Sequence, residues 1–235
     1  MEVEFLKKIV KEAEGISERH FEVHRKDDEG DIVTDLDLEI EKYLIEKIKE
    51  SYPDFVIVSE EFNAENAETD NCFIIDPIDG TINFANGLPM WGTQVACKKN
   101  GEVVASVINL PRMGEMYYAD ETGAYRNGER IRVREVPIKD ALYSIVGKKA
   151  ITDAVKMCAY TDHRRFFGAS CYDFTAMACG RIHGTNYRAE HPWDYEPGLF
   201  LCKMAGAVVK DVRGFHAAAM NQEFLDLLEK ETALR

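Results

Sequence analysis

The fold is decided by residues 72–81, which read CFIIDPIDGT. The four apolar residues at 72–75 predict a buried strand, and the chain then passes directly into Asp76. Asp76 and Asp79 are three residues apart, and Pro77 stiffens the turn between them. Unpaired carboxylates at the end of a buried strand are costly, and carboxylate oxygens are ligands that Mg²⁺ prefers. We therefore expect a metal site here; the alternative is a capped turn with Asp79 as the N-cap.

Gly80 and Thr81 extend this expected site toward an anion. They open a helix that we expect over residues 80–84, and the first backbone N–H groups of a helix have no partner within it. Such groups form a natural seat for a phosphate. Residues 76–81 therefore combine candidate metal ligands with a candidate phosphate seat.

Three further groups of carboxylates lie at the boundaries of predicted elements. Each group alone is more typical of a helix cap or a solvated charge. Caps do not explain the joint pattern well, and Glu60 and Glu61 follow a strand end, where parallel or mixed sheets bind their ligands. The groups are Glu60 and Glu61 after the apolar strand 55–58, Asp35 and Asp37 after Thr34, and Asp194 after Trp193.

The rest of the pattern predicts a chain with both helices and an antiparallel sheet. Asn-Gly dipeptides at 100–101 and 127–128 are typical of tight hairpin turns, so we expect a meander around them. Its strands are expected at residues 93–97, 103–110, 116–119, 124–126 and 131–133. Apolar spacing of three to four residues predicts helices. They are expected at residues 5–16, after residue 34, and at 151–158, 173–178 and 221–229.

Bulk properties exclude several classes of protein. The 235 residues carry a net charge of -13, which argues against nucleic acid or an anionic membrane as the main partner. We find no signal peptide and no run of about 18 apolar residues that would span a membrane. The six cysteines form no Cys-x-x-Cys pair, so a zinc ribbon is not indicated. We expect a cytoplasmic protein with reduced cysteines.

These motifs carry a resemblance to the inositol monophosphatase family, within the lithium-sensitive, metal-dependent sugar phosphatase superfamily. The family's first signature, Asp-Pro-Ile-Asp-Gly-Thr-x-Asn-Phe, is similar to residues 76–84 at every position. The second, Trp-Asp followed by Gly and Ala-Gly, resembles residues 193–206. Glu-Glu at 60–61 and Asp-x-Val-Thr-x-x-Asp at 31–37 complete the set.

The resemblance implies an α+β fold, a layered αβαβα sandwich of the inositol monophosphatase and fructose-1,6-bisphosphatase type. It predicts one phosphatase unit over residues 1–235 with two packed lobes. The N-terminal α+β lobe, residues 1–146, would carry most metal ligands. The C-terminal α/β lobe, residues 147–235, would carry Asp194 and the rim that contacts the substrate. A homodimer is also expected.

The resemblance further implies two or three Mg²⁺ ions per site. Glu60, Asp76 and the carbonyl of Ile78 would hold the first, and Asp76, Asp79 and Asp194 the second. Glu60 would support a third, with Asp37 through a water molecule. Bound metals of this kind bridge phosphate oxygens and lower the pKa of water.

The remaining implied roles concern catalysis and phosphate binding. Thr81 and Asp37 would orient and deprotonate the attacking water, with Glu60 contributing to catalysis as a ligand. The backbone N–H groups of Gly80 and Thr81 would hold the phosphate. Lys26 resembles a mobile basic residue of the family, and Asp35 is an additional acid with no assigned role.

The positions expected to contact the substrate depart from the family. Many members carry Glu where this chain has Tyr187, and Arg188 follows. An Arg near the substrate could bind a second phosphate or a carboxylate through two hydrogen bonds, although a surface Arg is as plausible. Ser170 follows a turn that resembles the family's sugar-contacting turn. The predicted substrate-binding residues are therefore Gly80, Thr81, Ser170, Tyr187 and Arg188.

Three functions stay open on this basis. The first is Mg²⁺-dependent hydrolysis of inositol monophosphate or a related sugar phosphate, with a small phosphorylated metabolite as partner. The second is a bisphosphate phosphatase that acts on fructose 1,6-bisphosphate or a nucleotide 3′-phosphate. The third is a regulatory relative that associates with RNA or the transcription machinery, against which the complete ligand set and the lack of a basic stripe both argue.

Overall fold

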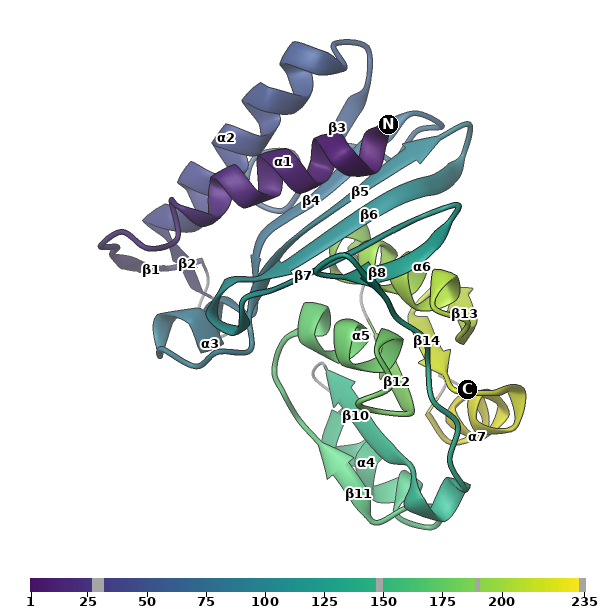
Figure 1. Ribbon diagram of the computed structural model, residues 1–235. Helices are drawn as coiled ribbons and strands as arrows, with labels where there is room; N and C mark the ends of the chain where they lie inside the picture. Colours follow the sequence, from purple (N-terminus) through teal and green to yellow (C-terminus); the bar gives the residue numbers. More distant parts are fainter. Residues whose placement is uncertain (27–31, 147–149, 189–190, 233–235) are drawn as a thin grey trace.

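The computed structural model describes residues 1–26, 32–146, 150–188 and 191–232. Its helices and sheets form five alternating layers (Figure 1), which confirms the predicted αβαβα sandwich. Helices α1 (Glu2–Glu14) and α2 (Asp35–Ser51) cover one face of a seven-stranded sheet. Helices α5 (Ser170–Ala178) and α6 (Glu196–Met204) lie between this sheet and a five-stranded sheet. The last layer holds α4 (Ala150–Met157) and α7 (Gln222–Thr232).

The seven-stranded sheet contains the predicted meander. Its order is β3-β4-β5-β6-β7-β8-β9; only β3 and β4 pair in parallel, and every other pair is antiparallel. The expected Asn-Gly turns are present, with positive φ at Asn100 and Asn127 and at the glycine after each. The strands are β3 (Val56–Ser59), β4 (Cys72–Asp79), β5 (Gly92–Lys99), β6 (Glu102–Leu110), β7 (Glu115–Asp120), β8 (Gly123–Arg126) and β9 (Glu129–Arg130).

One predicted strand of the meander is wrong. Residues 131–133 were expected to continue the sheet, but β9 ends at Arg130 after two residues. The backbone N–H of Val133 donates instead to the carbonyl of Ala205, 3.1 Å away, just beyond the end of α6. The chain therefore leaves the first sheet at this point and crosses to the middle helical layer.

The second sheet was not located strand by strand from the sequence. Its order is β11-β10-β12-β14-β13, with β10 parallel to both neighbours and β14 antiparallel to both of its own. The strand β10 precedes residue 147, so the second sheet begins before the predicted lobe boundary. The strands are β10 (Leu142–Val146), β11 (His163–Arg165), β12 (Gly184–Tyr187), β13 (Val208–Val212) and β14 (Phe215–Ala219).

Short elements complete the described chain. A two-stranded ribbon of β1 (Val23–Arg25) and β2 (Ile32–Thr34) precedes α2, and α3 (Thr81–Ala85) follows β4. Three 3-10 helices are η1 (Pro111–Met113), η2 (Ile138–Asp140) and η3 (Pro192–Asp194). No helix in the described ranges is both long and apolar enough to cross a membrane.

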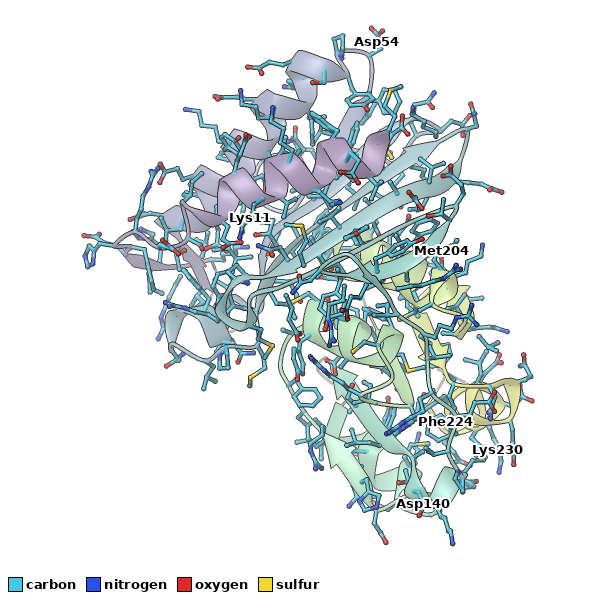
Figure 2. All side chains as sticks on the ribbon, viewed as in Figure 1. Lys11, Asp54, Asp140, Met204, Phe224 and Lys230 are labelled. Atoms are coloured by element: carbon cyan, nitrogen blue, oxygen red, sulfur yellow. The ribbon has the colours of Figure 1, made fainter. Side chains whose placement is uncertain are left out.

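Two large apolar cores hold the layers together. One lies between α1, α2 and the first sheet, and the other joins the far face of that sheet to α5, α6, the second sheet, α4 and α7. Phe224 of α7, labelled in Figure 2, is fully buried in this second core and packs over Gly184 of β12. All six cysteines are free thiols, and four of them are buried. The middle helices therefore pack against both sheets.

We predict that Gly198→Ala destabilises this middle layer. Gly198 belongs to the second signature and lies in α6, where an added Cβ would come 2.3 Å from Cδ2 of Phe174 on α5. Overpacking of this kind costs about 1–3 kcal/mol. Urea unfolding monitored by circular dichroism measures the loss. Gly15→Ala is the control, because its Cβ would meet only the Glu12 carbonyl at 3.7 Å; an equal loss in both variants would contradict the packing argument.

Candidate metal centre

The strand β4 delivers two carboxylates to one place through a backbone irregularity. In a regular strand, residues three apart point to opposite faces of the sheet. The pairing of β4 with β5 shifts register between Asp76 and Asp79, around Pro77. A bulge of this kind redirects side chains near functional sites. It lets both carboxylates approach the carboxyl end of β3, where Glu60 follows in the parallel neighbour.

The third carboxylate of this cluster comes from far along the chain. Asp194 ends η3, and its carboxylate oxygen lies with those of Asp76 and Asp79 so that all three are within 4.8 Å of one another. The neighbouring Trp193 is 4% exposed and packs with Val58 of β3 in a small apolar core. The indole therefore anchors η3 against the parallel strands, which gives the Trp-Asp signature a physical reason.

These side chains line one small open pocket of about 180 Å³. It contains every predicted metal ligand and both residues of the predicted phosphate seat, together with Ile82 and Gly168. The lining residues are Glu60, Asp76, Ile78, Asp79, Gly80, Thr81, Ile82, Gly168 and Asp194. The sequence-predicted ligand set is thus brought together in space, although its role as a ligand set stays a prediction.

The electrostatics of the pocket call for a cation. Burial, and then the charges of Glu60, Asp79 and Asp194, raise the pKa of Asp76 well above its ordinary value. Burial likewise raises the pKa of Asp79 and of Asp194. The Oδ1 atom of Asp76 is buried and accepts no hydrogen bond from the described residues. Crowded carboxylates and an unpaired oxygen are the arrangement that a bound divalent cation would stabilise, so the residues fit Mg²⁺.

Asp79 is also held by the middle helical layer. Its Oδ2 accepts a hydrogen bond of 2.5 Å from the backbone N–H of Cys171, in the first turn of α5. Positive partial charge at a helix N-terminus stabilises a carboxylate. The N-terminus of α5 therefore offsets part of the repulsion, and it links the second core to the candidate ligands.

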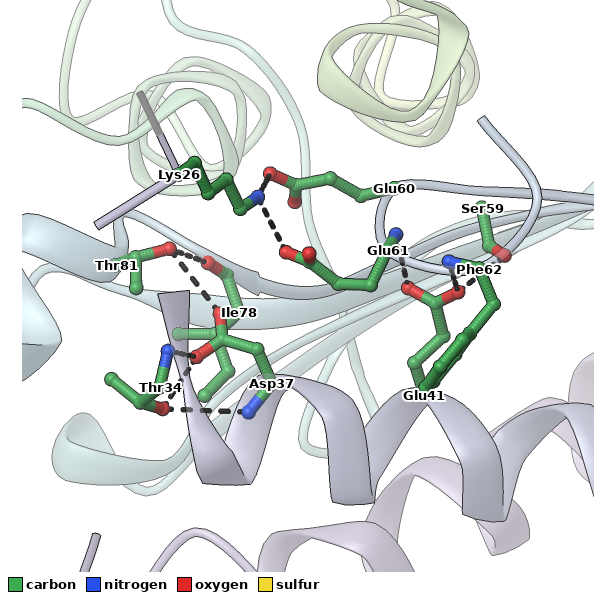
Figure 3. A network of polar contacts seen from close by, with 10 residues as sticks. All are labelled: Lys26, Thr34, Asp37, Glu41, Ser59, Glu60, Glu61, Phe62, Ile78 and Thr81. Carbon is green, nitrogen blue, oxygen red and sulfur yellow. Dashed lines mark hydrogen bonds and ion pairs between the residues drawn. The ribbon is translucent and has the colours of Figure 1, made fainter. Parts of the chain in front are cut away.

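Asp37 and Thr81 meet as the sequence predicted (Figure 3). Asp37 forms a capping box with Thr34 at the start of α2, where its Oδ2 accepts from the Thr34 backbone N–H at 2.8 Å. The Thr81 hydroxyl lies 3.3 Å from Oδ1 of Asp37 and 2.9 Å from the Ile78 carbonyl. Burial raises the pKa of Asp37 to about 6. A base with this pKa is mostly ionised at neutral pH and can accept a proton there.

Lys26 reaches the same edge of the pocket (Figure 3). Its Nζ lies 2.7 Å from Oε1 of Glu60 and 2.5 Å from Oε1 of Glu61. Burial lowers the pKa of Lys26, but the two carboxylates outweigh it and the pKa is raised overall. The ammonium is therefore charged and offsets acidic charge beside a candidate ligand.

Sequence reasoning missed two buried polar residues beside the pocket. Gln94 of β5 has its amide nitrogen 3.4 Å from both Asp76 Oδ2 and Ser170 Oγ. Glu41 of α2 holds the turn that contains Glu60 and Glu61. Glu41 lies one helical turn after Asp37, and that spacing was the available signal, because residues four apart share a helix face.

The predicted substrate contacts are placed less uniformly than the ligands. Burial, and then the charge of Asp194, raise the pKa of Tyr187 at the end of β12 well above its ordinary value. Ser170 is 1% exposed and faces Gln94, and neither it nor Tyr187 lines the pocket. Asp35 pairs with His24 at 2.7 Å on the exposed surface, also away from the pocket.

The structure does not bring Arg188 to the pocket. Its Nη2 lies 2.7 Å from a carboxylate oxygen of Asp153 on α4, and it also donates to the carbonyl of Thr232 on α7. Both side chains of the ion pair are largely buried, with 14% and 2% of their surfaces exposed. The guanidinium thus ties the outer helices to β12, and the geometry gives it a structural position in place of the expected substrate contact.

The layered αβαβα sandwich is the fold of inositol monophosphatases and fructose-1,6-bisphosphatases. In this chain, acidic side chains gather at the carboxyl ends of β3 and β4. The chain belongs to the inositol monophosphatase family, whose sequence profile matches residues 3–231.

Named relatives agree with this membership. The chain is 35% identical over 207 residues to the fructose-1,6-bisphosphatase/inositol-1-monophosphatase of Thermotoga maritima, covering 86% of this chain and 80% of that protein. It is 32% identical over 201 residues to the Nus factor SuhB of Escherichia coli, covering 80% and 74%. The solved structure of a Thermotoga maritima IMPase superposes with a TM-score of 0.88 at 29% identity, covering 97% of this chain and 95% of that one.

We expect Arg188→Met to reduce stability and to leave substrate affinity unchanged. Removal of one partner from a buried ion pair costs about 3–5 kcal/mol, since the other charge stays buried. Thermal and urea unfolding measure this loss, and KM for any turned-over phosphate ester measures the second effect. Adding Asp153→Asn should recover part of the stability. A several-fold rise in KM with unchanged stability would instead support the prediction that Arg188 contacts the substrate.

Two acids beside the pocket predict that the protein becomes less stable as the pH rises when no divalent cation is present. Burial raises the pKa of Asp37 from 3.8 to about 6 and that of Glu61 from 4.5 to about 7. The folded protein therefore keeps protons that the unfolded chain has released, so its stability falls as pH rises through this window. Urea unfolding in chelator should show a decline from about pH 4 to about pH 7, and Mg²⁺ should reduce it. Stability that rises through the window in chelator would count against the argument.

Proposed function

We propose that the chain hydrolyses small phosphate monoesters, such as inositol monophosphate or a related sugar phosphate, with the help of Mg²⁺. One observation carries the proposal: the carboxylates of Asp76, Asp79 and Asp194 lie within 4.8 Å of one another, in the pocket that Gly80 and Thr81 also line. Membership of a family named for a monophosphatase supports the reaction class. Candidate ligands and a phosphate seat thus share a single site.

The donor set suits two or three Mg²⁺ ions. Glu60, Asp76 and the Ile78 carbonyl would hold one, while Asp76, Asp79 and Asp194 would hold another; Glu60 would support a third. When bound, such ions lower the pKa of water and offset the charge of the phosphate and of the leaving oxygen. All of these donors are carboxylate or carbonyl oxygens, which is the chemistry that Mg²⁺ selects.

The protein's own groups would position the water and receive its proton. A water that hydrogen-bonds to Thr81 Oγ1 can pass a proton to that oxygen as the hydroxyl proton moves to Oδ1 of Asp37, 3.3 Å away. The Thr34 backbone N–H fixes the other oxygen of Asp37, so the accepting oxygen keeps its orientation. Phosphoryl transfer needs mainly positioning and charge stabilisation, and these contacts would supply the positioning.

The backbone at Gly80 supports the phosphate seat. Its φ of +83° is left-handed, and a Cβ there would come 2.8 Å from the Cβ of Ala169. Glycine is therefore required sterically, and it keeps the backbone N–H groups of residues 80 and 81 accessible to a small anion. Because α3 has only five residues, these N–H groups would bind phosphate through direct hydrogen bonds, with a small contribution from a helix dipole.

Two alternatives keep specific support. A bisphosphate phosphatase is suggested by the name of the Thermotoga maritima relative, although Arg188, the residue that favoured it, is bound to Asp153. A regulatory role is suggested by the Nus factor SuhB relatives, and the complete set of acidic residues in one pocket favours the enzyme. Lithium sensitivity, a homodimer and a cytoplasmic location stay predictions.

Phosphate release over a panel of esters tests the proposed reaction. Inositol 1-phosphate, fructose 1,6-bisphosphate and adenosine 3′,5′-bisphosphate are incubated with the protein in Mg²⁺ and in chelator, with and without Li⁺. We expect Mg²⁺-dependent release from inositol 1-phosphate, whereas faster release from either bisphosphate would favour the bisphosphate phosphatase. A folded protein that releases phosphate from none of them would favour the regulatory alternative.

Asp76→Asn is predicted to separate activity from folding. Loss of this central ligand should lower phosphate release by at least about two orders of magnitude. The variant should unfold at the same temperature as wild type in chelator, or at a higher one, because one of the crowded carboxylates is gone. Differential scanning fluorimetry and the release assay on the same sample give both values. Retained phosphatase activity would show that Asp76 is not an essential metal ligand.

A further inference from the structure

Glu41 makes an unusual set of hydrogen bonds beneath the candidate metal centre (Figure 3). Its side chain is fully buried in α2. Oε1 accepts from the Ser59 hydroxyl at 2.6 Å and from the backbone N–H of Phe62 at 2.8 Å. Oε2 accepts from the backbone N–H of Glu61 at 2.8 Å. Both carboxylate oxygens are therefore used by the segment that leaves β3.

The segment that Glu41 holds is the one that presents Glu60. Residues 60–62 form a turn outside any helix or strand, so their N–H groups have no partner in a regular element. The two N–H groups after Glu60 both point to one carboxylate from the neighbouring helix. Glu60 is thereby fixed at its position beside Asp76, and its own carboxylate stays at the pocket.

Two acids on the same face of helix α2 contact the segments that form the pocket. Asp37 and Glu41 are four residues apart, which places them one above the other on a helix. Asp37 contacts the Thr81 hydroxyl after β4, while Glu41 contacts the turn after β3. A rigid helix therefore sets the distance between the two strand ends that supply the candidate ligands.

We propose that Glu41 is a positioning residue that orients Glu60 for binding the divalent cation, an inference that rests on the proposed function. A buried carboxylate is expensive, and an apolar side chain of similar size would serve a merely structural role at lower cost. The carboxylate is needed here because only an acceptor with two oxygens matches two N–H groups and a hydroxyl at once. Groups that orient metal ligands usually change metal affinity about 10–100-fold when they are altered.

The decisive variant is Glu41→Gln, which keeps the size of the side chain. Its NH₂ group must face at least one of the three donors, so the turn loses an acceptor. Titration calorimetry of Mg²⁺ into the folded protein, without substrate, should show about ten-fold weaker binding. The Mg²⁺ concentration for half-maximal phosphate release should rise by the same factor, whereas kcat at saturating Mg²⁺ should change less than about three-fold.

Matched variants separate positioning from general damage. Glu46→Gln changes an exposed acid of the same helix and should leave Mg²⁺ binding unchanged. Ser59→Ala removes one of the three hydrogen bonds and should weaken binding about two- to five-fold, in the same direction. A folded Glu41→Gln protein with wild-type Mg²⁺ affinity overturns the proposal. If that variant does not fold, unchanged affinity in Ser59→Ala overturns it.

The same titration distinguishes this proposal from the proposed function. Calorimetry detects cation binding whether or not any ester is hydrolysed. Weaker binding in Glu41→Gln together with no phosphate release from any ester would support the positioning role and reject the phosphatase assignment. Normal phosphate release together with unchanged Mg²⁺ binding in Glu41→Gln would support the phosphatase assignment and reject the positioning role.

Discussion

Mutual repulsion among crowded carboxylates is the constraint on which the site depends. Asp76, Asp79 and Asp194 are held within 4.8 Å of one another, and burial already disfavours the charge of each. Such an arrangement raises the free energy of the folded protein unless a positive charge enters it. Contacts elsewhere in the fold must therefore hold these carboxylates close together. A bound cation would relieve their repulsion, and this relief would add to its binding free energy.

Each supporting contact comes from a different layer of the sandwich. The N-terminus of α5 donates to Asp79, Trp193 packs η3 on the parallel strands, and Glu41 holds the turn at Glu60. The first contact comes from the middle helical layer, the second from η3 against the first sheet, and the third from α2 on the other face of that sheet. The site consequently forms only when the layers are assembled, so metal affinity should report on the integrity of the whole fold.

The sequence predicted those features whose signals are local. Residues 72–81 carry strand, turn and helix start together, and Asn-Gly at 100–101 requires left-handed backbone that a hairpin supplies. The strands of the second sheet could not all be predicted, because β11 and β12 have only three and four residues, too few for a periodic signal. The partner of Arg188 escaped too, since Asp153 is 35 residues away in sequence and only the assembled layers bring them together.

Under the proposed function, different parts of this structure would set the reaction and the choice of substrate. The acids around Asp76 would act on any phosphate ester, because they would face the phosphate side of a substrate. Discrimination would then depend on other residues of the pocket lining, such as Ile82 of α3 and Gly168 before α5. The second sheet comes near the centre at Tyr187, where burial and then the charge of Asp194 raise the pKa of the phenol. A change at Tyr187 can therefore alter the surroundings of a candidate metal ligand although Tyr187 does not line the pocket, so metal affinity and KM must be measured independently.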